Sequence, residues 1–219
     1  MLRNKTFSKA VFATLAGVGM ITMLAQQLHA ETTVTTSIET IRTDVGGLTL
    51  DYAGLKTEVE GGFGGLHYDA TLSAGDMEGV GARDLDIRAG YLFGDVAGPA
   101  VAYEYAKIGS EAMDRVLVGI EGAYSLSDAA KVGGRLVSDI DEFGDDYTLT
   151  LDGDYALGEG LTLTGEYEHV RLGTMDSDEA KIGARYGLTE AAFLDGKVTY
   201  TDAEGVDATG VEAGIGFSF

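Results

Sequence analysis

An alternation of apolar and polar residues, repeated every 31 positions, constrains the fold of this chain more than any other feature. Aromatic residues close successive apolar segments at Phe93, Tyr124, Tyr155, Tyr186 and Phe217, and each lies 31 positions after the one before. A repeat at fixed spacing indicates one supersecondary unit that is used several times. The sequence therefore predicts a repetitive architecture.

The segment 147–169 shows what the repeated unit is. Tyr147, Leu149 and Leu151 alternate with polar residues, and the alternation resumes beyond the glycines of 158–160. Alternation with period two across a glycine-containing turn is typical of a β-hairpin. Six such units fit between Glu31 and Phe219, which predicts an all-β chain of about twelve antiparallel strands. Ten strands is the alternative, because the first hairpin, over 33–63, loses its phase near Ala53.

The first thirty residues have a different character. Arg3, Lys5 and Lys9 precede an uncharged apolar stretch at 10–25, and Ala30 supplies a small residue at a plausible cleavage point. This order is typical of a secretory signal peptide, and the apolar stretch is short for a membrane anchor, the alternative interpretation. We expect a cleaved signal peptide over 1–30 and one domain over 31–219.

Charge and cysteine content exclude several kinds of site. The net charge of −21 argues against nucleic acid as a partner, because such binding needs a basic surface. The chain has no cysteine and so neither disulfides nor thiolate metal ligands. Its acidic stretches lack the ligand spacing of a dedicated calcium loop. We expect no metal and no cofactor.

Alternation alone does not say which face of the strands meets water. The repeated aromatics stand at strand ends, as in the aromatic belt of a membrane interface. Connections near the aromatics, such as 127–129 and 158–160, are short, whereas those on the other side, such as "DIDEFGDD" at 139–146, look longer and acidic. Both features favour a transmembrane up-and-down β-barrel whose apolar face meets lipid. A soluble secreted β-protein remains the alternative.

The final residues carry a family resemblance. Val211, Ala213, Ile215, Phe217 and Phe219 are apolar at alternate positions up to the last residue. With the predicted signal peptide and strands, this ending resembles the outer-membrane β-barrels of Gram-negative bacteria, in particular small porin-like proteins. The resemblance implies a location in the cell outer membrane, among its lipid and lipopolysaccharide, and recognition of the last strand by the barrel-assembly machinery. It leaves the oligomeric state open. The implied periplasmic aromatic belt comprises Phe93, Tyr124, Tyr155, Tyr186, Phe217 and Phe219.

In such a barrel, the polar face of the strands lines the interior. Hairpin registers read from the turn centres place Glu121 opposite Arg135, Asp152 opposite Glu166, and Arg185 opposite Asp195. Two acids side by side are tolerable only in water or beside a cation such as Lys181. The candidate lumen and constriction residues form a belt of mixed charge: Glu104, Glu121, Arg135, Asp152, Glu166, Arg185, Asp195 and Lys197.

The function that follows is a narrow channel for passive diffusion of small hydrophilic solutes or ions. Twelve strands lie between the filled eight-stranded barrels and the open channels of sixteen or more. Small inward residues such as Gly133 and Gly183 favour an open path, and the excess of inward acids predicts weak cation selectivity. The alternative is a structural or adhesive barrel that pairs its charges inside and works through acidic extracellular loops.

An enzymatic function is not expected. The predicted domain has two histidines, His67 facing inward and His169 facing outward near the outer rim. Neither has a nucleophile at a fixed spacing, which nucleophilic catalysis requires.

Overall fold

The computed structural model describes residues 31–94, 96–158 and 160–219, so the predicted signal peptide lies outside the described residues. Within these ranges the chain forms twelve strands. They are β1 (Glu31–Val45), β2 (Leu48–Phe63), β3 (Leu66–Met77), β4 (Val80–Tyr91), β5 (Ala97–Ile108), β6 (Glu111–Ser127), β7 (Ala130–Asp139), β8 (Tyr147–Gly158), β9 (Leu161–Leu172), β10 (Met175–Gly187), β11 (Ala192–Ala203) and β12 (Val206–Ser218). None of the described residues belongs to a helix long and apolar enough to cross a membrane.

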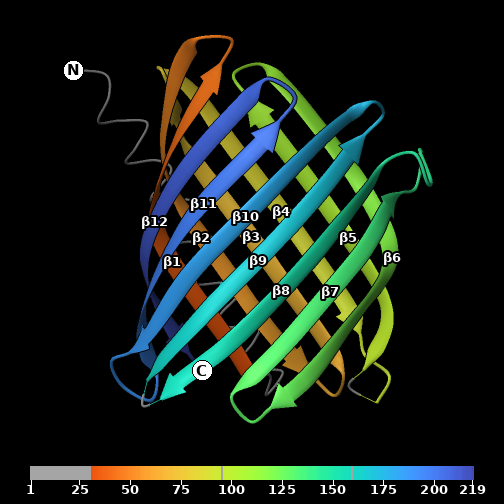
Figure 1. Cartoon of the computed structure of the whole chain (residues 1–219), viewed down its shortest axis with the longest axis vertical. Helices are drawn as coiled ribbons and strands as arrows, with labels where there is room; N and C mark the ends of the chain where they lie inside the picture. Colours follow the sequence, from red (N-terminus) through yellow and green to blue (C-terminus); the bar gives the residue numbers. More distant parts are fainter. Residues whose placement is uncertain (1–30, 95, 159) are drawn as a thin grey trace.

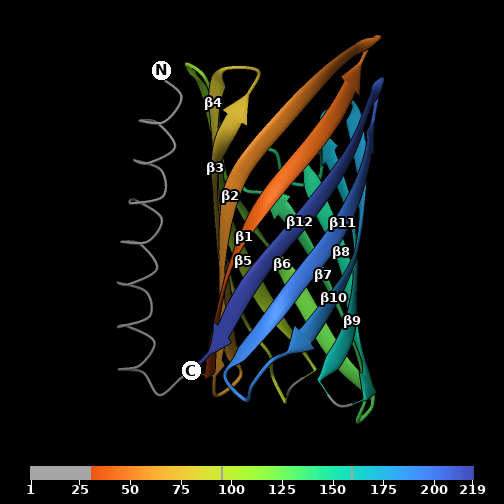
Figure 2. The ribbon, with the colours of Figure 1, turned by 90° about the vertical axis from the view of Figure 1, so that its left-hand side faces the viewer.

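The strands form a closed antiparallel barrel (Figures 1 and 2). Each strand pairs with its neighbours in the chain, and β1 pairs with β12, with Ser37 opposite Gly214. The last residue joins this seam, because the Phe219 amide donates a hydrogen bond of 2.9 Å to the Thr32 carbonyl. Closure removes the exposed edge that an open sheet would leave. The prediction of an up-and-down barrel of about twelve strands is confirmed, and the ten-strand alternative is wrong.

The first hairpin forms without irregularity despite its weak pattern. Strands β1 and β2 pair continuously from Val45 opposite Leu48 to the start of β1. Near Ala53, the apolar residues of β2 move from the inner face to the outer face of the strand. Tyr52 lines the interior, whereas Leu55 lies on the outer face. The turn between the strands is Gly46-Gly47, and both glycines have positive φ (56° and 86°). Such a two-residue turn matches the twist of paired strands and fixes their register.

The turn lengths differ from the sequence prediction. At the end opposite the repeated aromatics, most hairpins close in two residues, as at Gly109-Ser110 and Glu204-Gly205. Only the stretch 140–146 is longer among the described connections there. The expectation of longer acidic loops was therefore wrong, because acidic stretches such as 111–114 continue as strand. Backbone pairing satisfies more hydrogen-bonding groups than an open loop would.

The outer surface carries apolar side chains in the middle of the strands. Ile38, Ile120 and Ile182 are 63%, 65% and 73% exposed. A soluble barrel would bury most isoleucines of its strands rather than expose them in this way. The six predicted belt aromatics are also exposed, by 44–66%, and all lie at or near strand ends on one side, the aromatic end of the barrel. Tyr68, near the start of β3, lies at the same end.

Candidate functional site

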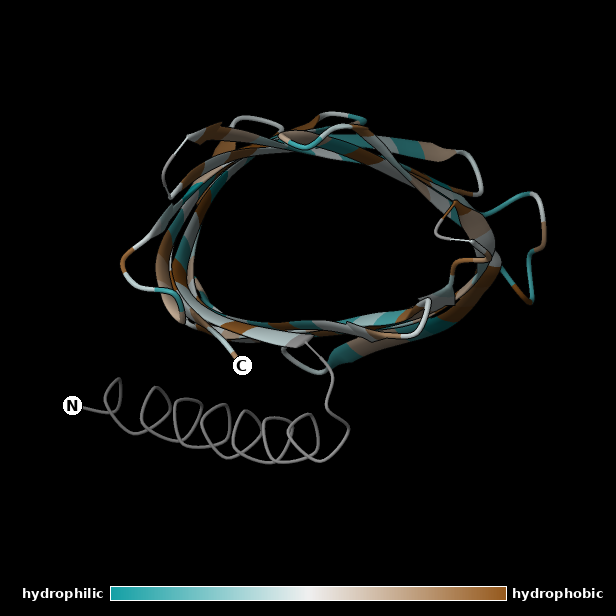
Figure 3. Ribbon diagram, turned by 90° about the horizontal axis from the view of Figure 1, so that it is seen from below, coloured by the Kyte–Doolittle hydropathy of each residue, from teal (hydrophilic) through white to brown (hydrophobic). Residues whose placement is uncertain are grey.

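The barrel is oval in cross-section when viewed along its axis (Figure 3). The eight candidate lumen residues lie on the inner face of their strands, and the predicted registers are those found: Glu121 opposite Arg135, Asp152 opposite Glu166, and Arg185 opposite Asp195. Strand alternation alone determines this placement, because neighbours at i and i+2 share a face.

The inner charges form ion pairs with neighbouring strands. The Arg135 guanidinium lies 3.2 Å from the Glu121 carboxylate, and that of Arg185 lies 3.2 Å from Asp195. The adjacent acids Asp152 and Glu166 do not share a cation. The Lys181 ammonium lies 2.8 Å from the Glu166 carboxylate and forms no ion pair with Asp152. Asp152 makes no ion pair among the described residues.

A second ion-pair chain lies on the β11–β12–β1–β2 side, where sequence reasoning assigned few residues. Lys56 on β2 lies 2.7 Å from Glu58 and 3.2 Å from Glu212 on β12. Lys197 on β11 reaches the same Glu58 at 2.9 Å. Ser37 donates to Glu212 at 2.6 Å, so hydrogen bonds and ion pairs fasten the closing seam from inside. Lys197 was among the predicted lumen residues, whereas Ser37, Lys56 and Glu58 lie in the first hairpin, whose phase the sequence left unresolved.

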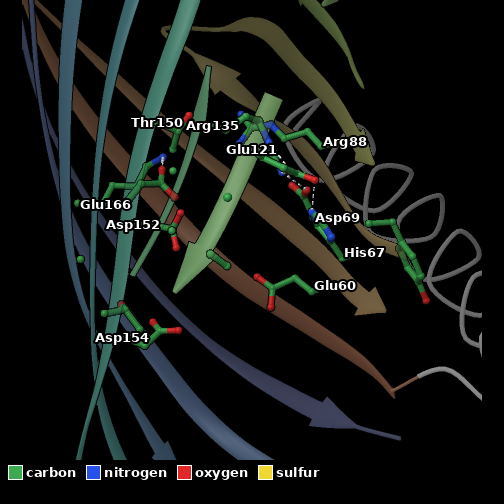
Figure 4. Close-up of a pocket in the computed structure, with 18 of the residues that line it drawn as sticks. Glu60, His67, Asp69, Arg88, Glu121, Arg135, Thr150, Asp152, Asp154 and Glu166 are labelled. Atoms are coloured by element: carbon green, nitrogen blue, oxygen red, sulfur yellow. Dashed lines mark hydrogen bonds and ion pairs between the residues drawn. The ribbon is translucent and has the colours of Figure 1, made fainter. Parts of the chain in front are cut away.

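Other contacts cross the interior between strands that are not neighbours. The Arg88 guanidinium on β4 lies 3.6 Å from the Glu168 carboxylate on β9. Arg135 on β7 lies 3.6 Å from Asp69 on β3, and His67 Nε2 lies 2.6 Å from Glu121 Oε1. Figure 4 shows His67, Asp69, Glu121 and Arg135 gathered in this way. The sequence pattern did not predict these contacts, because distances across a barrel do not follow from alternation.

Two cavities remain beside these contacts. The lower chamber, about 490 Å³, is lined toward the aromatic end by residues such as Leu92 and Ala123. The upper chamber, about 450 Å³, reaches Thr43 and Met77 near the opposite end. The two chambers share a set of lining residues, here called the neck: Glu60, Asp69, Arg88, Glu166, Lys181 and Lys197.

One side of the interior is filled. Ala100, Ala102, Leu117 and Val137 form a buried cluster on β5–β7, and Leu117 has no exposed surface. Apolar contacts inside the barrel thus replace water along that wall. The two chambers lie beside this cluster.

Several inward glycines do not leave free space, contrary to expectation. A side chain at Gly90 would collide with the Glu121 carboxylate, and one at Gly133 with that of Asp152. The Phe193 ring covers Gly216 in the same way, and the Arg185 guanidinium stacks 4.2 Å from the centre of that ring. These glycines accommodate neighbouring side chains, so the small inward residues contribute less to an open path than their number implies.

The two histidines lie as the sequence predicted, on opposite faces. His67 lines the lower chamber, whereas His169 lies in the outward-facing set of β9. His169 Nδ1 is 2.9 Å from Asp178 and its Nε2 is 3.4 Å from the Tyr147 hydroxyl. Among the described residues, no cluster of three or more histidine and acidic side chains is placed to hold a metal ion.

Comparison with known proteins places the fold among outer-membrane barrels. No protein-family model matches the chain, and no curated protein matches it. Solved structures do. The KdgM porin aligns with a TM-score of 0.56 at 16% identity over 84% of this chain and 99% of that one, and the NanC porin with 0.58 at 11% over 83% and 98%. The translocator domain of the autotransporter NalP from Neisseria meningitidis aligns with 0.52 at 14% over 97% and 98%. The chain therefore has the fold of small outer-membrane β-barrels.

Proposed function

We propose that this protein is a narrow outer-membrane channel through which small hydrophilic solutes or ions diffuse passively. The observation that carries the proposal is the pair of chambers that meet at the neck, because together they span the barrel from Leu92 to Met77. A conducting barrel needs a polar path of this kind, lined by groups that replace part of the hydration of a solute. The likeness to porins supports the proposal at the level of fold.

The charge of the path favours weak selectivity for cations. Every lysine and arginine that lines the chambers has a carboxylate partner within 4 Å. Among the described residues, six lining carboxylates have none: Glu39, Glu60, Asp84, Asp86, Asp152 and Asp154. Unpaired acids leave a negative potential in the path, which attracts cations. The paired cations nearby keep that potential modest.

The proposed surroundings follow from the outer surface. The exposed isoleucines of the mid-strand band fit the hydrocarbon region, and the aromatic end fits an interface. We place the aromatic end in the periplasm and the opposite end among lipopolysaccharide. The barrel-assembly machinery is the proposed partner of β12. No catalytic role is assigned to His67 or His169.

A closed structural barrel is the second candidate. The Arg88–Glu168 and Arg135–Asp69 contacts cross the interior, and the apolar cluster around Leu117 fills one wall. These contacts favour a filled barrel. The structure does not favour an adhesive barrel that works through acidic extracellular loops, because two-residue turns stand in place of most of those loops.

Recording ion currents across planar lipid bilayers tests the proposal. Protein refolded in detergent and added to the bilayer should give discrete conductance steps, and a salt gradient should give a reversal potential of the sign expected for cation preference. A heat-treated sample that has lost its compact form is the control. The absence of steps from correctly folded protein would favour the closed barrel, and an anion preference would refute the selectivity.

A further inference from the structure

The upper chamber contains acidic groups that the ion-pair network leaves unused. Glu39 on β1 and Asp84 on β4 line the chamber, and neither carboxylate has a cationic partner within 4 Å among the described residues. Asp86, two positions along β4 toward the neck, is also unpaired. Burying a carboxylate without a positively charged partner costs free energy. A ligand that carries a positive charge to these carboxylates would therefore bind favourably.

A buried hydroxyl lies between the two carboxylates. Tyr52 on β2 is only 7% exposed, and its hydroxyl has no hydrogen-bond partner. The ring lies over Gly54 and Gly75, with the hydroxyl closest to Gly54. Gly54 is the register partner of Glu39, and Gly75 pairs with Ala82, two residues before Asp84. The hydroxyl therefore occupies the strip of barrel wall that separates Glu39 from Asp84. A buried polar group without a partner calls for an explanation, and a bound ligand is one.

The lysines of the chamber do not neutralise this site. Lys56 is held between Glu58 and Glu212 at 2.7 and 3.2 Å. Lys181 contacts Glu166 and Glu179, at 2.8 and 2.6 Å. Lys197 contacts Glu58, at 2.9 Å. Moving Lys56 to Glu39 or Asp84 would leave Glu212 unpaired, and moving Lys181 would leave Glu166 and Glu179 unpaired.

The spacing of the acids indicates the class of ligand. A metal ion needs several oxygen ligands converging on one point, and among the described residues no three acidic or histidine side chains do so. Glu39 and Asp84 instead stand on different strands with β2 and β3 between them. Two separated carboxylates with a hydroxyl between them suit a ligand with two separated positive charges. The chamber, at about 450 Å³, has the volume of a small-molecule site.

We propose that the upper chamber binds a linear organic diammonium ion. One ammonium group is held by Glu39 and the Tyr52 hydroxyl, and the other by Asp84 and Asp86. The inference deepens the proposed channel function by naming a class of solute that the path retains. Binding itself does not require the barrel to conduct.

Titration calorimetry of the refolded barrel with diaminobutane tests the site. We expect saturable binding to the unmodified protein. Glu39→Gln and Asp84→Asn should each weaken binding about tenfold, the usual cost of a lost charge-assisted hydrogen bond. Tyr52→Phe, which keeps the ring over the two glycines, should weaken it roughly threefold, as expected for a neutral hydrogen bond. All three changes nearly preserve side-chain shape, and heat-dependent gel mobility verifies folding.

Asp114→Asn is the matched control, because Asp114 is exposed near the start of β6 and the change removes the same charge. It should leave binding unaltered. Equal weakening by Asp114→Asn, or displacement of diaminobutane by magnesium at the same concentration, would overturn the proposal in favour of diffuse charge attraction. Absence of saturable binding would overturn it outright.

Bilayer recordings separate this inference from the channel proposal. If the barrel conducts and diaminobutane reduces its current in the unmodified protein but not in Glu39→Gln, both stand. If the barrel conducts, but diaminobutane neither changes the current nor gives a binding signal in calorimetry, the diammonium site is refuted and the channel proposal stands. If calorimetry detects the site but no current is found, the site stands and the channel proposal fails.

Discussion

The guanidinium of Arg88 on β4 lies 3.6 Å from the carboxylate of Glu168 on β9, on opposite walls of the barrel. Glu168 also accepts a 3.3 Å hydrogen bond from the Thr150 hydroxyl. The contact spans the interior beside the apolar cluster around Leu117. Arg88 lines both chambers, so the contact occupies part of the cross-section where they meet.

Replacing Arg88 by alanine should widen the path, because it removes the cross-lumen contact and a side chain of the neck. We expect single-channel conductance to increase roughly twofold, since conduction depends on the narrowest lined section. Arg83→Ala is the control, because Arg83 is an exposed arginine of the same strand that faces outward. Unchanged conductance in Arg88→Ala would mean that the path is limited elsewhere.

Reversing the charge of Glu60 should alter selectivity. Glu60 lies at the neck, is exposed there, and has no ion pair among the described residues. Glu60→Lys should lower the cation-to-anion permeability ratio by roughly two- to threefold, most strongly at low salt where screening is weak. Reversal potentials in a potassium chloride gradient measure the ratio. Asp114→Lys makes the same charge change on the outer surface, and an equal effect there would show that the neck does not control selectivity.

A charge on the outer band distinguishes a membrane barrel from a soluble one. Ile182 lies in the middle of β10 and is 73% exposed. In a bilayer, Ile182→Arg should reduce the free energy of unfolding by about 2–4 kcal/mol, the cost of arginine near the midplane. In water, the same exposed position would tolerate arginine. Denaturant unfolding in lipid vesicles provides the measurement, with Asp207→Arg near the start of β12 as the control. An Ile182→Arg barrel as stable as that control would argue against a lipid-facing band.

The close contact of β6 with β7 makes Gly119 sensitive to substitution. A methyl group at Gly119 would collide with the Leu136 carbonyl and the Val137 Cα, which are backbone atoms of a paired strand. Backbone cannot rotate aside, so Gly119→Ala should destabilise the barrel by about 2–3 kcal/mol, the usual cost of overpacking. Gly165→Ala has open space and should change stability little. Comparable unfolding midpoints for the two variants would contradict this account.

The terminal aromatic should matter more for assembly in cells than for folding. Phe219 is half exposed, and its structural contribution is the backbone hydrogen bond to Thr32. Phe219→Ala keeps that bond, so refolding in detergent should be unchanged. In cells, the amount in the outer membrane should fall severalfold if an assembly machine reads the ring. An equal loss in both settings would indicate a structural role instead, and no loss in either would refute recognition.

The sequence by itself determined the class of fold and the face on which each residue lies. Alternation with period two assigned Glu121, Arg135, Asp195 and Lys197 to one face, and the turn centres predicted registers that the structure confirms. These properties are local, because a strand places residues i and i+2 on the same side whatever lies elsewhere. The first hairpin was the exception. There, Tyr52 turns inward beyond the apolar band, and the Arg42–Asp51 ion pair at 3.1 Å lies on the exposed face.

Only the tertiary structure decided what the interior contains. The contacts of Arg88 with Glu168 and of Arg135 with Asp69 join strands that are distant in the chain, and they depend on the oval section of the closed barrel. Whether an inward glycine leaves space depends likewise on which side chain leans over it, as Glu121 does over Gly90. Hydrophobic periodicity reports which side of a strand meets which environment. The distance between opposite walls follows from closure, stagger and packing together, so no single strand encodes it.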